Sequence, residues 1–199
     1  MKESDNTTRR RGDVLTQSIY AAAIKLIKEV GYSNLTFRQI AQAAETSRTV
    51  LYRRWATTFD LIQEIKEYKS RMASNGRFID RIEDTGSLRS DFLRLLTLYQ
   101  GVYTEVGREV MDAFLFEMGQ KNEKIEELMI KATEMNILIM RKLLGFAKSR
   151  GDKIKEVSDM TLAMPFDLVR IANLWHKDEI GADQLELLVD EILLPIFKA

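Results

Sequence analysis

The sequence contains no cysteine, which excludes disulfide bonds, thiolate catalysis and cysteine-ligated zinc. Its single histidine, His176, cannot supply a zinc ligand set alone, and we expect it near a helix end, where it would interact favourably with the helix dipole. There is no glycine-rich phosphate loop, and no Ser-His-Asp arrangement is possible without His176. We therefore predict no catalytic residue, no metal site and no cofactor.

Long apolar runs are also missing. No stretch approaches the roughly 18 apolar residues of a membrane-spanning helix, so we expect no membrane span. The N-terminal segment MKESDNTTRRRGD lacks the apolar core of a secretion signal. In the absence of either signal, the cytoplasm is the expected location.

Proline is scarce: Pro165 and Pro195 are the only two. Long segments instead repeat their apolar residues with a period of 3.6, which predicts an all-α protein with about nine helices. The expected helices cover residues 13–30, 36–44, 47–55, 57–72 (the last continuing toward Ile82), 87–103, 108–119, 121–150, 158–176 and 183–197. Pro165 should either kink its helix or mark its start.

The formal net charge is zero, but the charges are unevenly distributed. Residues 1–71 carry 13 Lys/Arg and 8 Asp/Glu, whereas residues 72–199 carry 17 and 22. A basic N-terminal part on an acidic remainder favours nucleic-acid binding by the first part.

Residues 36–58 predict a helix-turn-helix. Thr36 and Gln39 form a capping box, and helical spacing then buries Phe37, Ile40, Ala41 and Ala44. After a break at residues 44–46, Ser47 can cap a second helix, RTVLYRRW. Val50, Leu51 and Trp55 pack inward in that helix, while Arg48, Thr49, Tyr52, Arg53 and Arg54 remain for the opposite face.

That opposite face has the chemistry of a major-groove reader. Arginine pairs with guanine, threonine contacts the thymine methyl group, and a tyrosine hydroxyl can bind a phosphate. The alternative is a cationic helix face that is only solvated.

The stretch from Val14 to Leu61 resembles the DNA-binding domain of the TetR/AcrR transcriptional regulators. The resemblance rests on AAAIKLIKEVGYSNLTFRQIAQAA, then SRTVLYRRW, then a capped helix beginning TTFDLI. The chain departs from the family at Glu45, where glycine is usual, and at Ala56 and Thr58, where proline and lysine are usual. Since Glu45 lacks the freedom of glycine, we expect a helix-like rather than left-handed backbone there.

The resemblance implies DNA contacts from both helices. Arg48 and Thr49, then Arg53, are the candidates for base edges, and the hydroxyl-bearing residues would bind phosphates. The full predicted DNA-binding set is Thr36, Ser47, Arg48, Thr49, Tyr52, Arg53, Arg54, Thr57 and Thr58.

Four segments make up the predicted domain organisation. Residues 1–12 form a disordered arm whose arginines, Arg9–Arg11, could contact DNA; residues 13–57 form the helix-turn-helix domain; and residues 58–83 form a connecting helix. Residues 84–199 form a helical body, which in this family binds a small-molecule effector and pairs with a second subunit through its last two long helices.

The body is rich in flexible and aromatic side chains. Taken singly they are typical of an ordinary helical core, and as a set they could line an adaptable apolar pocket. The candidate ligand-binding residues are Tyr99, Tyr103, Met111, Phe114, Met118, Met135 and Met140.

The sequence thus predicts a homodimeric, sequence-specific transcriptional regulator. We expect a repressor that a small apolar or amphipathic ligand releases from an inverted-repeat operator in double-stranded DNA. Two alternatives stay open: a helical dimerisation or scaffold protein without DNA binding, and a small enzyme using the body cavity.

Overall fold

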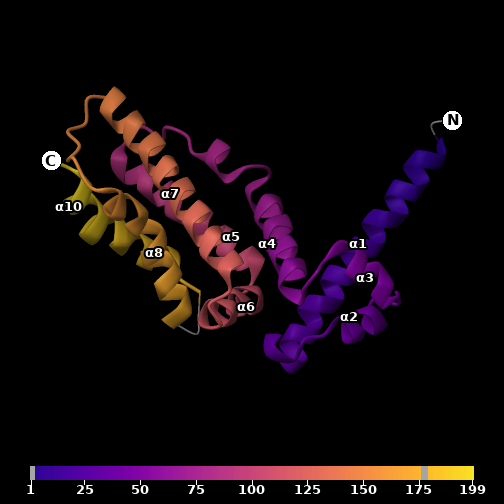
Figure 1. Cartoon of the computed structure of the whole chain (residues 1–199). Helices are drawn as coiled ribbons and strands as arrows, with labels where there is room; N and C mark the ends of the chain where they lie inside the picture. Colours follow the sequence, from indigo (N-terminus) through magenta and orange to yellow (C-terminus); the bar gives the residue numbers. More distant parts are fainter. Residues whose placement is uncertain (1–2, 176–178) are drawn as a thin grey trace. The chain divides into compact units, whose positions relative to one another are not determined.

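The computed structural model describes residues 3–175 and 179–199, except for the side chains of residues 3–11 (Figure 1). His176, which we expected near a helix end, lies outside the described residues. Within the described part the secondary structure is helical, apart from one isolated β-bridge between Ile154 and Lys198. With the continuous C-terminal run counted once, this part contains nine α-helices, so the all-α prediction is confirmed. Within the described residues, no helix combines the length and the apolar composition that a membrane span requires.

The chain divides into two compact units. The head unit comprises Met1–Tyr68 and Val106–Asn122, and the body unit comprises Lys69–Glu105 and Glu123–Ala199. From the sequence we expected residues 84–199 to form the body. Residues 106–122 instead belong to the head unit.

The head unit is built around the helix-turn-helix. Its elements are α1 (Glu3–Val30), η1 (Tyr32–Asn34), α2 (Phe37–Ala43), α3 (Arg48–Arg54), the first part of α4 (Thr58–Ser74) and α6 (Arg108–Gly119). Gly31, with φ 77°, ends α1 where the sequence predicted, and its N–H donates to the Ile27 carbonyl. The three helices α1, α2 and α3 pack on one apolar core that includes Ile19, Ile40 and Leu51, all fully buried.

The first helix starts earlier than the sequence suggested. We expected a disordered arm over residues 1–12, whereas α1 is helical from Glu3. No proline interrupts residues 3–30, and extending a helix that already exists costs far less than starting one. Arg9–Arg11 therefore lie within α1, and their side chains are outside the described part.

The connecting helix is shorter than predicted. It ends at Ser74 instead of continuing toward Ile82. Asn75 and Gly76 then adopt left-handed conformations, and the Gly76 N–H donates to the Arg71 carbonyl over 3.0 Å. This closure ends the helix, and the short 3-10 turn η2 (Phe78–Arg81) follows.

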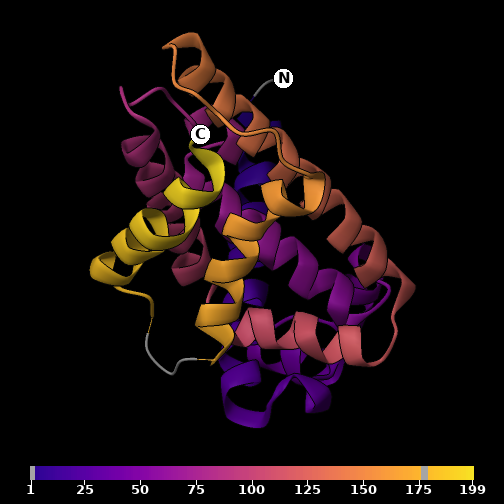
Figure 2. The ribbon, with the colours of Figure 1, turned by 90° about the vertical axis from the view of Figure 1, so that its left-hand side faces the viewer.

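The body unit is a helical bundle around one apolar core. It contains α5 (Leu88–Val106), α7 (Glu123–Ser149), α8 (Asp159–Trp175), and the C-terminal run of α9 (Ala182–Leu187), the π-helical η3 (Leu188–Leu193) and α10 (Leu194–Phe197). Figure 2 shows the C-terminal run in yellow and α8 in orange to yellow on one side of this bundle. Phe92, Phe166 and Phe197 are fully buried and bring three of these elements into the same core.

Both prolines lie within helices. Pro165 is buried inside α8, whose start is set earlier by Ser158, because the Ser158 hydroxyl accepts the Thr161 N–H at 3.3 Å. Pro195 has no N–H to donate, and the wider π turn directly precedes it.

A buried carboxylate joins the start of α5 to the end of α7. Asp91 is 2% exposed and accepts hydrogen bonds from the Thr85 N–H at 2.8 Å and the Thr85 hydroxyl at 2.7 Å. Its second oxygen accepts from Arg150 Nη2 at 2.6 Å. Thr85 lies just before α5 and Arg150 just after α7, so this carboxylate ties the two helix ends together.

Candidate nucleic-acid interface

The turn between α2 and α3 closes differently from our expectation. The predicted capping box is present: the Thr36 N–H donates to Gln39 Oε1 at 2.8 Å, and the Gln39 N–H donates to the Thr36 hydroxyl at 3.3 Å. At the other end of α2, however, Glu45 has φ 50°. The Thr46 N–H bonds to the Ala41 carbonyl at 2.9 Å, and this closure requires a left-handed residue at Glu45. The expected helix-like conformation of Glu45 is therefore wrong.

The second helix, α3, is anchored by few residues. Ser47 caps it, with its hydroxyl accepting the Val50 N–H at 3.3 Å. Leu51 is fully buried and Trp55, 3% exposed, ends the helix. These contacts leave most of the circumference of α3 accessible.

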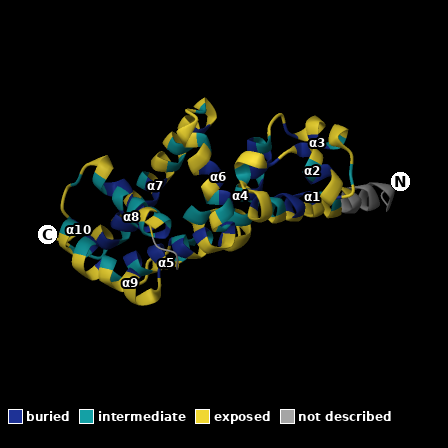
Figure 3. Ribbon diagram, turned by 90° about the horizontal axis from the view of Figure 1, so that it is seen from below, coloured by how far each residue is buried: buried dark blue, intermediate teal, exposed yellow. Residues whose placement is uncertain are grey.

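The accessible face carries four of the predicted DNA-contacting residues: Arg48, Thr49, Tyr52 and Arg53 are all exposed. Figure 3 shows exposed residues of the ribbon in yellow around the label α3. Among the described residues, Arg48 and Arg53 form no ion pair or hydrogen bond. Tyr52 is 62% exposed, and its ring packs edge-on against Phe37 with ring centroids 5.0 Å apart. This contact with a buried residue fixes the orientation of the Tyr52 ring. The arrangement offers two free guanidinium groups, a methyl-bearing hydroxyl and a phenol to a ligand.

Arg54 differs from its neighbours. Its Nη1 donates to the Thr16 hydroxyl at 2.7 Å, and its Nη2 donates to Glu64 Oε1 at 3.2 Å. Its guanidinium also lies 4.3 Å from the centre of the Trp55 ring. Arg54 is thus engaged within the head unit.

The predicted phosphate-binding hydroxyls fall into two groups. Thr36 donates to Gln39 Oε1 at 2.6 Å, and Thr57 donates to Asp60 Oδ2 at 2.9 Å, so both hydroxyl protons are used inside helix caps. Ser47 only accepts in its cap, which leaves its proton for another acceptor. Thr58, the first residue of α4, is half-buried. Because a phosphate oxygen needs a donor, Ser47 is the best placed of the four.

One exposed cation, Arg38, was not among the DNA-binding residues predicted from the sequence. Arg38 lies on α2, is exposed, and forms no ion pair or hydrogen bond with the rest of the described chain. The signal was present, because the helical period that buries Phe37, Ile40 and Ala41 turns position 38 outward.

Helix α6 is held to the head unit by polar and aromatic contacts. The Tyr32 hydroxyl donates to Glu117 Oε1 at 2.5 Å, and the Tyr32 ring packs edge-on against Phe116 at 5.5 Å. Burial, followed by the hydrogen-bonded Glu117 carboxylate, raises the pKa of Tyr32 well above its ordinary value. The other Glu117 oxygen accepts from Asn122 Nδ2 at 2.6 Å, so this carboxylate has partners on both sides.

The seven candidate ligand-binding residues do not share one unit. Met111, Phe114 and Met118 lie on α6, in the head unit. Phe114 packs edge-on against Phe59, with ring centroids 5.1 Å apart, and Lys66 Nζ lies 5.4 Å from its ring centre. Phe114 is therefore a packing residue between α4 and α6.

The remaining candidates, Tyr99, Tyr103, Met135 and Met140, lie in the body unit. Met140 is fully buried in the core, and Met135 is exposed on α7. Tyr99 packs edge-on against both Phe78 and Phe166, with ring centroids 6.1 and 5.1 Å away. Tyr103 is buried. Two aromatic side chains of α5 thus enter the interior of the bundle.

Polar groups that the sequence analysis missed lie beside these tyrosines. Gln100 and Asn173 are buried and exchange two hydrogen bonds, Gln100 Nε2 to Asn173 Oδ1 at 3.1 Å and Asn173 Nδ2 to Gln100 Oε1 at 2.7 Å. Arg170 Nη2 donates to the Tyr99 hydroxyl at 3.4 Å. These pairs join α5 to α8. Because the partners lie more than 70 positions apart, no short-range sequence pattern could predict that they meet.

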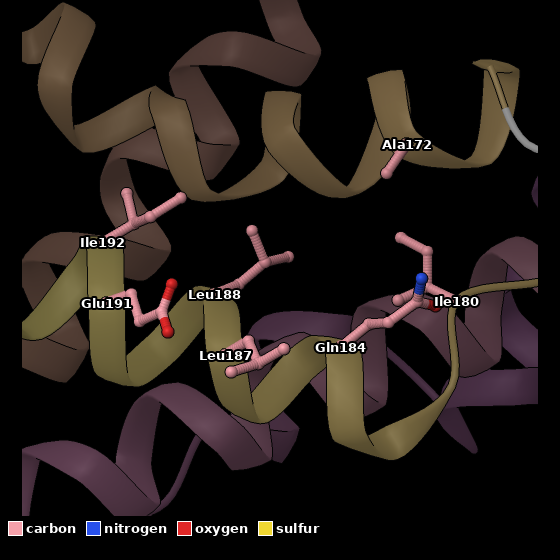
Figure 4. A pocket seen from close by; sticks show the side chains of 7 residues that line it. All are labelled: Ala172, Ile180, Gln184, Leu187, Leu188, Glu191 and Ile192. Atoms are coloured by element: carbon pink, nitrogen blue, oxygen red, sulfur yellow. The ribbon is translucent and has the colours of Figure 1, made fainter.

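A shallow pocket opens between α8 and the C-terminal run. It encloses about 260 Å³ and is lined by Ala172, Ile180, Gln184, Leu187, Leu188, Glu191 and Ile192 (Figure 4). Ile192, Leu188 and Ala172 point from the two helices toward the space between them. None of the seven candidate ligand-binding residues lines this pocket.

An apolar stripe runs along α8, the helix that contributes Ala172 to this pocket. Met160, Met164, Leu168, Ile171 and Trp175 recur in it at helical spacing, and Met164 and Leu168 are partly buried against the core of the body unit. Met160, Ile171 and Trp175 are largely exposed, with Trp175 at 80%, and Leu187 of α9 is 55% exposed. So many large apolar side chains on one surface indicate an interaction face.

Two family models match the chain. Residues 19–65 match the model described as "Bacterial regulatory proteins, tetR family". Residues 82–192 match that of the "Tetracyclin repressor-like, C-terminal domain". The two matches cover the helix-turn-helix and most of the rest of the chain.

Individual proteins give similar results. A DNA-binding transcriptional repressor TetR of Mycobacteroides abscessus is 30% identical over 83 residues, which cover 42% of this chain and 41% of that relative. A TetR transcription regulator of Haloarcula marismortui has a similar fold, with a TM-score of 0.71 at 17% identity over 92% of this chain and 98% of that one. AibR, solved with isovaleryl coenzyme A and operator DNA, gives a TM-score of 0.61 at 15% identity over the same fractions, 92% and 98%.

Proposed function

The chain belongs to the TetR family of bacterial regulatory proteins, and we propose that it is a homodimeric transcriptional repressor which a small apolar or amphipathic molecule releases from an inverted-repeat operator. The family match favours this function over a scaffold without DNA binding. A regulator of bacterial transcription would act in the cytoplasm.

One observation carries the DNA-binding proposal. Arg48, Thr49, Tyr52 and Arg53 share the exposed face of a capped helix, and neither Arg48 nor Arg53 has an ionic partner among the described residues. Two unpaired arginines on one short helix favour an anionic partner, and the adjacent threonine and tyrosine suit base and phosphate contacts. Arg48 and Thr49, at the N-terminal end of α3, would read base edges. Ser47 and Tyr52 would bind phosphates, with Arg38 as an additional cation.

A homodimer follows from the small size of this reading surface. One three-helix head buries too little DNA for tight binding, whereas two heads about one helical turn apart can occupy both halves of an inverted repeat. We place the dimer interface on the apolar stripe of α8 and on the C-terminal run that borders the pocket. These are the last two long helices of the chain.

For the effector we propose the interior face of α5 and α8 in the body unit. Tyr99 and Tyr103 supply aromatic surface there, and the Gln100–Asn173 and Arg170–Tyr99 pairs supply polar partners. These groups suit a molecule with an apolar part and a polar end. AibR was solved with both a small molecule and operator DNA, and a similar linkage would operate here.

The DNA-binding proposal is tested with a duplex selected from a random library by the full chain. Arg48→Ala should weaken binding by roughly 1–3 kcal/mol and relax the sequence preference at one position, whereas Tyr52→Phe should weaken binding to all sequences about equally. Unchanged affinity and unchanged site preference in Arg48→Ala would refute the assignment of α3 as the reading helix.

The effector proposal has a separate test. A compound that binds the body should raise the unfolding temperature of the chain. It should also lower the affinity of the chain for the operator, and the operator should lower the affinity of the chain for the compound by the same factor. A compound that binds tightly and leaves operator affinity unchanged would contradict release by that compound.

A further inference from the structure

One carboxylate connects three helices of the head unit. Glu64, on α4, accepts a hydrogen bond from the Tyr20 hydroxyl of α1 at 2.5 Å and from Trp55 Nε1, at the end of α3, at 2.8 Å. Arg54 of α3 adds a third donor, with Nη2 at 3.2 Å from Glu64 Oε1. The C-terminal end of α3 is therefore tied to α1 and α4 through a single side chain.

Arg54 adds a second connection to α1. Its Nη1 donates to the Thr16 hydroxyl at 2.7 Å, and that hydroxyl in turn donates to the Gly12 carbonyl at 2.9 Å. Because the guanidinium also stacks on Trp55, three partners hold it in place. A lysine could not reproduce this arrangement, since an ammonium lacks the planar fork that reaches two acceptors and a ring together.

We propose that Glu64 and Arg54 are positioning residues for DNA recognition, which fix the orientation of α3 so that Arg48, Thr49 and Arg53 reach the bases together. Arg54 itself then makes no contact with DNA, unlike Arg53 beside it. This inference rests on the proposed DNA-binding function. It adds that specificity depends on an acidic residue lying outside the reading helix.

The sign of one effect separates this proposal from simple electrostatics. Replacing an acidic residue of a DNA-binding unit by a neutral one removes repulsion from the phosphates, so it should strengthen binding. If Glu64 orients α3, Glu64→Gln should instead weaken binding to the selected duplex. Glu67→Gln, three residues further on the same helix and exposed, removes an equal charge without touching this cluster and is the matched control.

Salt dependence separates the two roles of Arg54. Each cation that contacts a phosphate contributes about 0.9 to the slope of log affinity against log salt concentration. Arg54→Lys keeps the charge, so a phosphate-contacting Arg54 would retain both slope and affinity in that variant. A positioning Arg54 would lose affinity for the selected duplex because the fork is lost.

The experiment measures fluorescence anisotropy of two duplexes, the one selected from a random library by the wild-type chain and one of unrelated sequence. The full-length variants are Glu64→Gln, Arg54→Lys, the double variant and Glu67→Gln. Each concentration is corrected for the active fraction, and far-ultraviolet circular dichroism confirms folding.

We expect Glu64→Gln and Arg54→Lys each to bind the selected duplex about tenfold more weakly, with binding to the unrelated duplex and the salt slope unchanged. The double variant should lose no more than either single variant, because both disrupt one cluster. A merely structural role would reduce the active fraction and leave the ratio of specific to non-specific affinity unchanged.

Tighter or unchanged binding of the selected duplex by Glu64→Gln, or full retention of affinity by Arg54→Lys, would overturn the proposal. Additive losses in the double variant would also overturn it, since they would mean that the two residues act separately. Failure of the wild-type chain to select any duplex is a distinct result, which would refute the proposed function itself.

Discussion

Ile171 offers a direct test of the proposed dimer interface. It lies between Leu168 and Trp175 in the apolar stripe of α8 and is 53% exposed. Complete burial of such a side chain is worth about 1.5–3 kcal/mol, so covering the exposed half contributes about 1 kcal/mol. A two-fold interface contains the residue twice, and Ile171→Ala should therefore weaken dimerisation by about 2 kcal/mol, or about 30-fold in the dissociation constant.

The charged substitution should have a larger effect. Ile171→Glu would place two carboxylates in an apolar interface, at a cost of several kcal/mol each, and should leave the chain monomeric at micromolar concentration. The matched control is Ile130→Glu, an exposed isoleucine on α7 of the same unit, which should not change dimerisation. Sedimentation velocity over a range of concentrations measures all three variants.

Tryptophan fluorescence gives a second measure of the same interface. The chain contains two tryptophans; Trp55 is 3% exposed and Trp175 is 80% exposed. Acrylamide should therefore quench mainly Trp175 in the monomeric Ile171→Glu variant and much less of the total emission in the wild-type dimer. A wild-type dimer whose stability is unaffected by Ile171→Glu, or whose Trp175 stays fully quenchable, would refute the interface.

Three further predictions concern the stability of the two units. Asp91→Asn removes the buried carboxylate that pairs with Arg150 and should lower the free energy of unfolding by about 3 kcal/mol in chemical denaturation. Asp80→Asn breaks the exposed pair with Arg77 and should change the free energy of unfolding by less than about 1 kcal/mol. Equal effects of the two substitutions would contradict the role of burial. Glu45→Gly should raise the free energy of unfolding by about 0.5–1 kcal/mol, because glycine relieves the left-handed strain while the greater entropy of the unfolded chain offsets part of the gain. Glu45→Ala should give no such gain. Burial raises the pKa of Tyr32 in the folded state, so as the pH rises the unfolded chain loses this proton first. The stabilising contribution of Tyr32 is therefore present below the ordinary tyrosine pKa of about 10, and the wild type should lose stability relative to Tyr32→Phe as the pH rises above about 10; parallel pH profiles would contradict the shift.

The parts of the head that are encoded locally could be predicted from the sequence. The Thr36–Gln39 box, the Ser47 cap and the glycine at position 31 each involve residues within about one helical turn, and all three occur where expected. The exposed face of α3 followed from the same helical period. Here the local chemistry of the chain determines the structure.

What could not be predicted depends on partners distant in the sequence or on a choice between local conformations. Arg54 looked like its neighbour Arg53, and only its contacts with Thr16 and Glu64 distinguish the two. The placement of α6 in the head unit depends on Tyr32 and Glu117, which are 85 positions apart. Glu45 adopted the left-handed conformation because closing α2 required it, against the preference of the residue itself.

In-vitro selection from a random duplex library shows whether this chain reads an inverted repeat as a dimer through α3. The full-length chain should enrich two inverted half-sites whose centres lie about 10 base pairs apart, bound by one dimer. Selection with Arg48→Ala should lose the preference at one symmetric position in each half-site. Enrichment of no sequence, or of a single half-site bound by one copy of the chain, would refute the reading of an inverted repeat by a dimer.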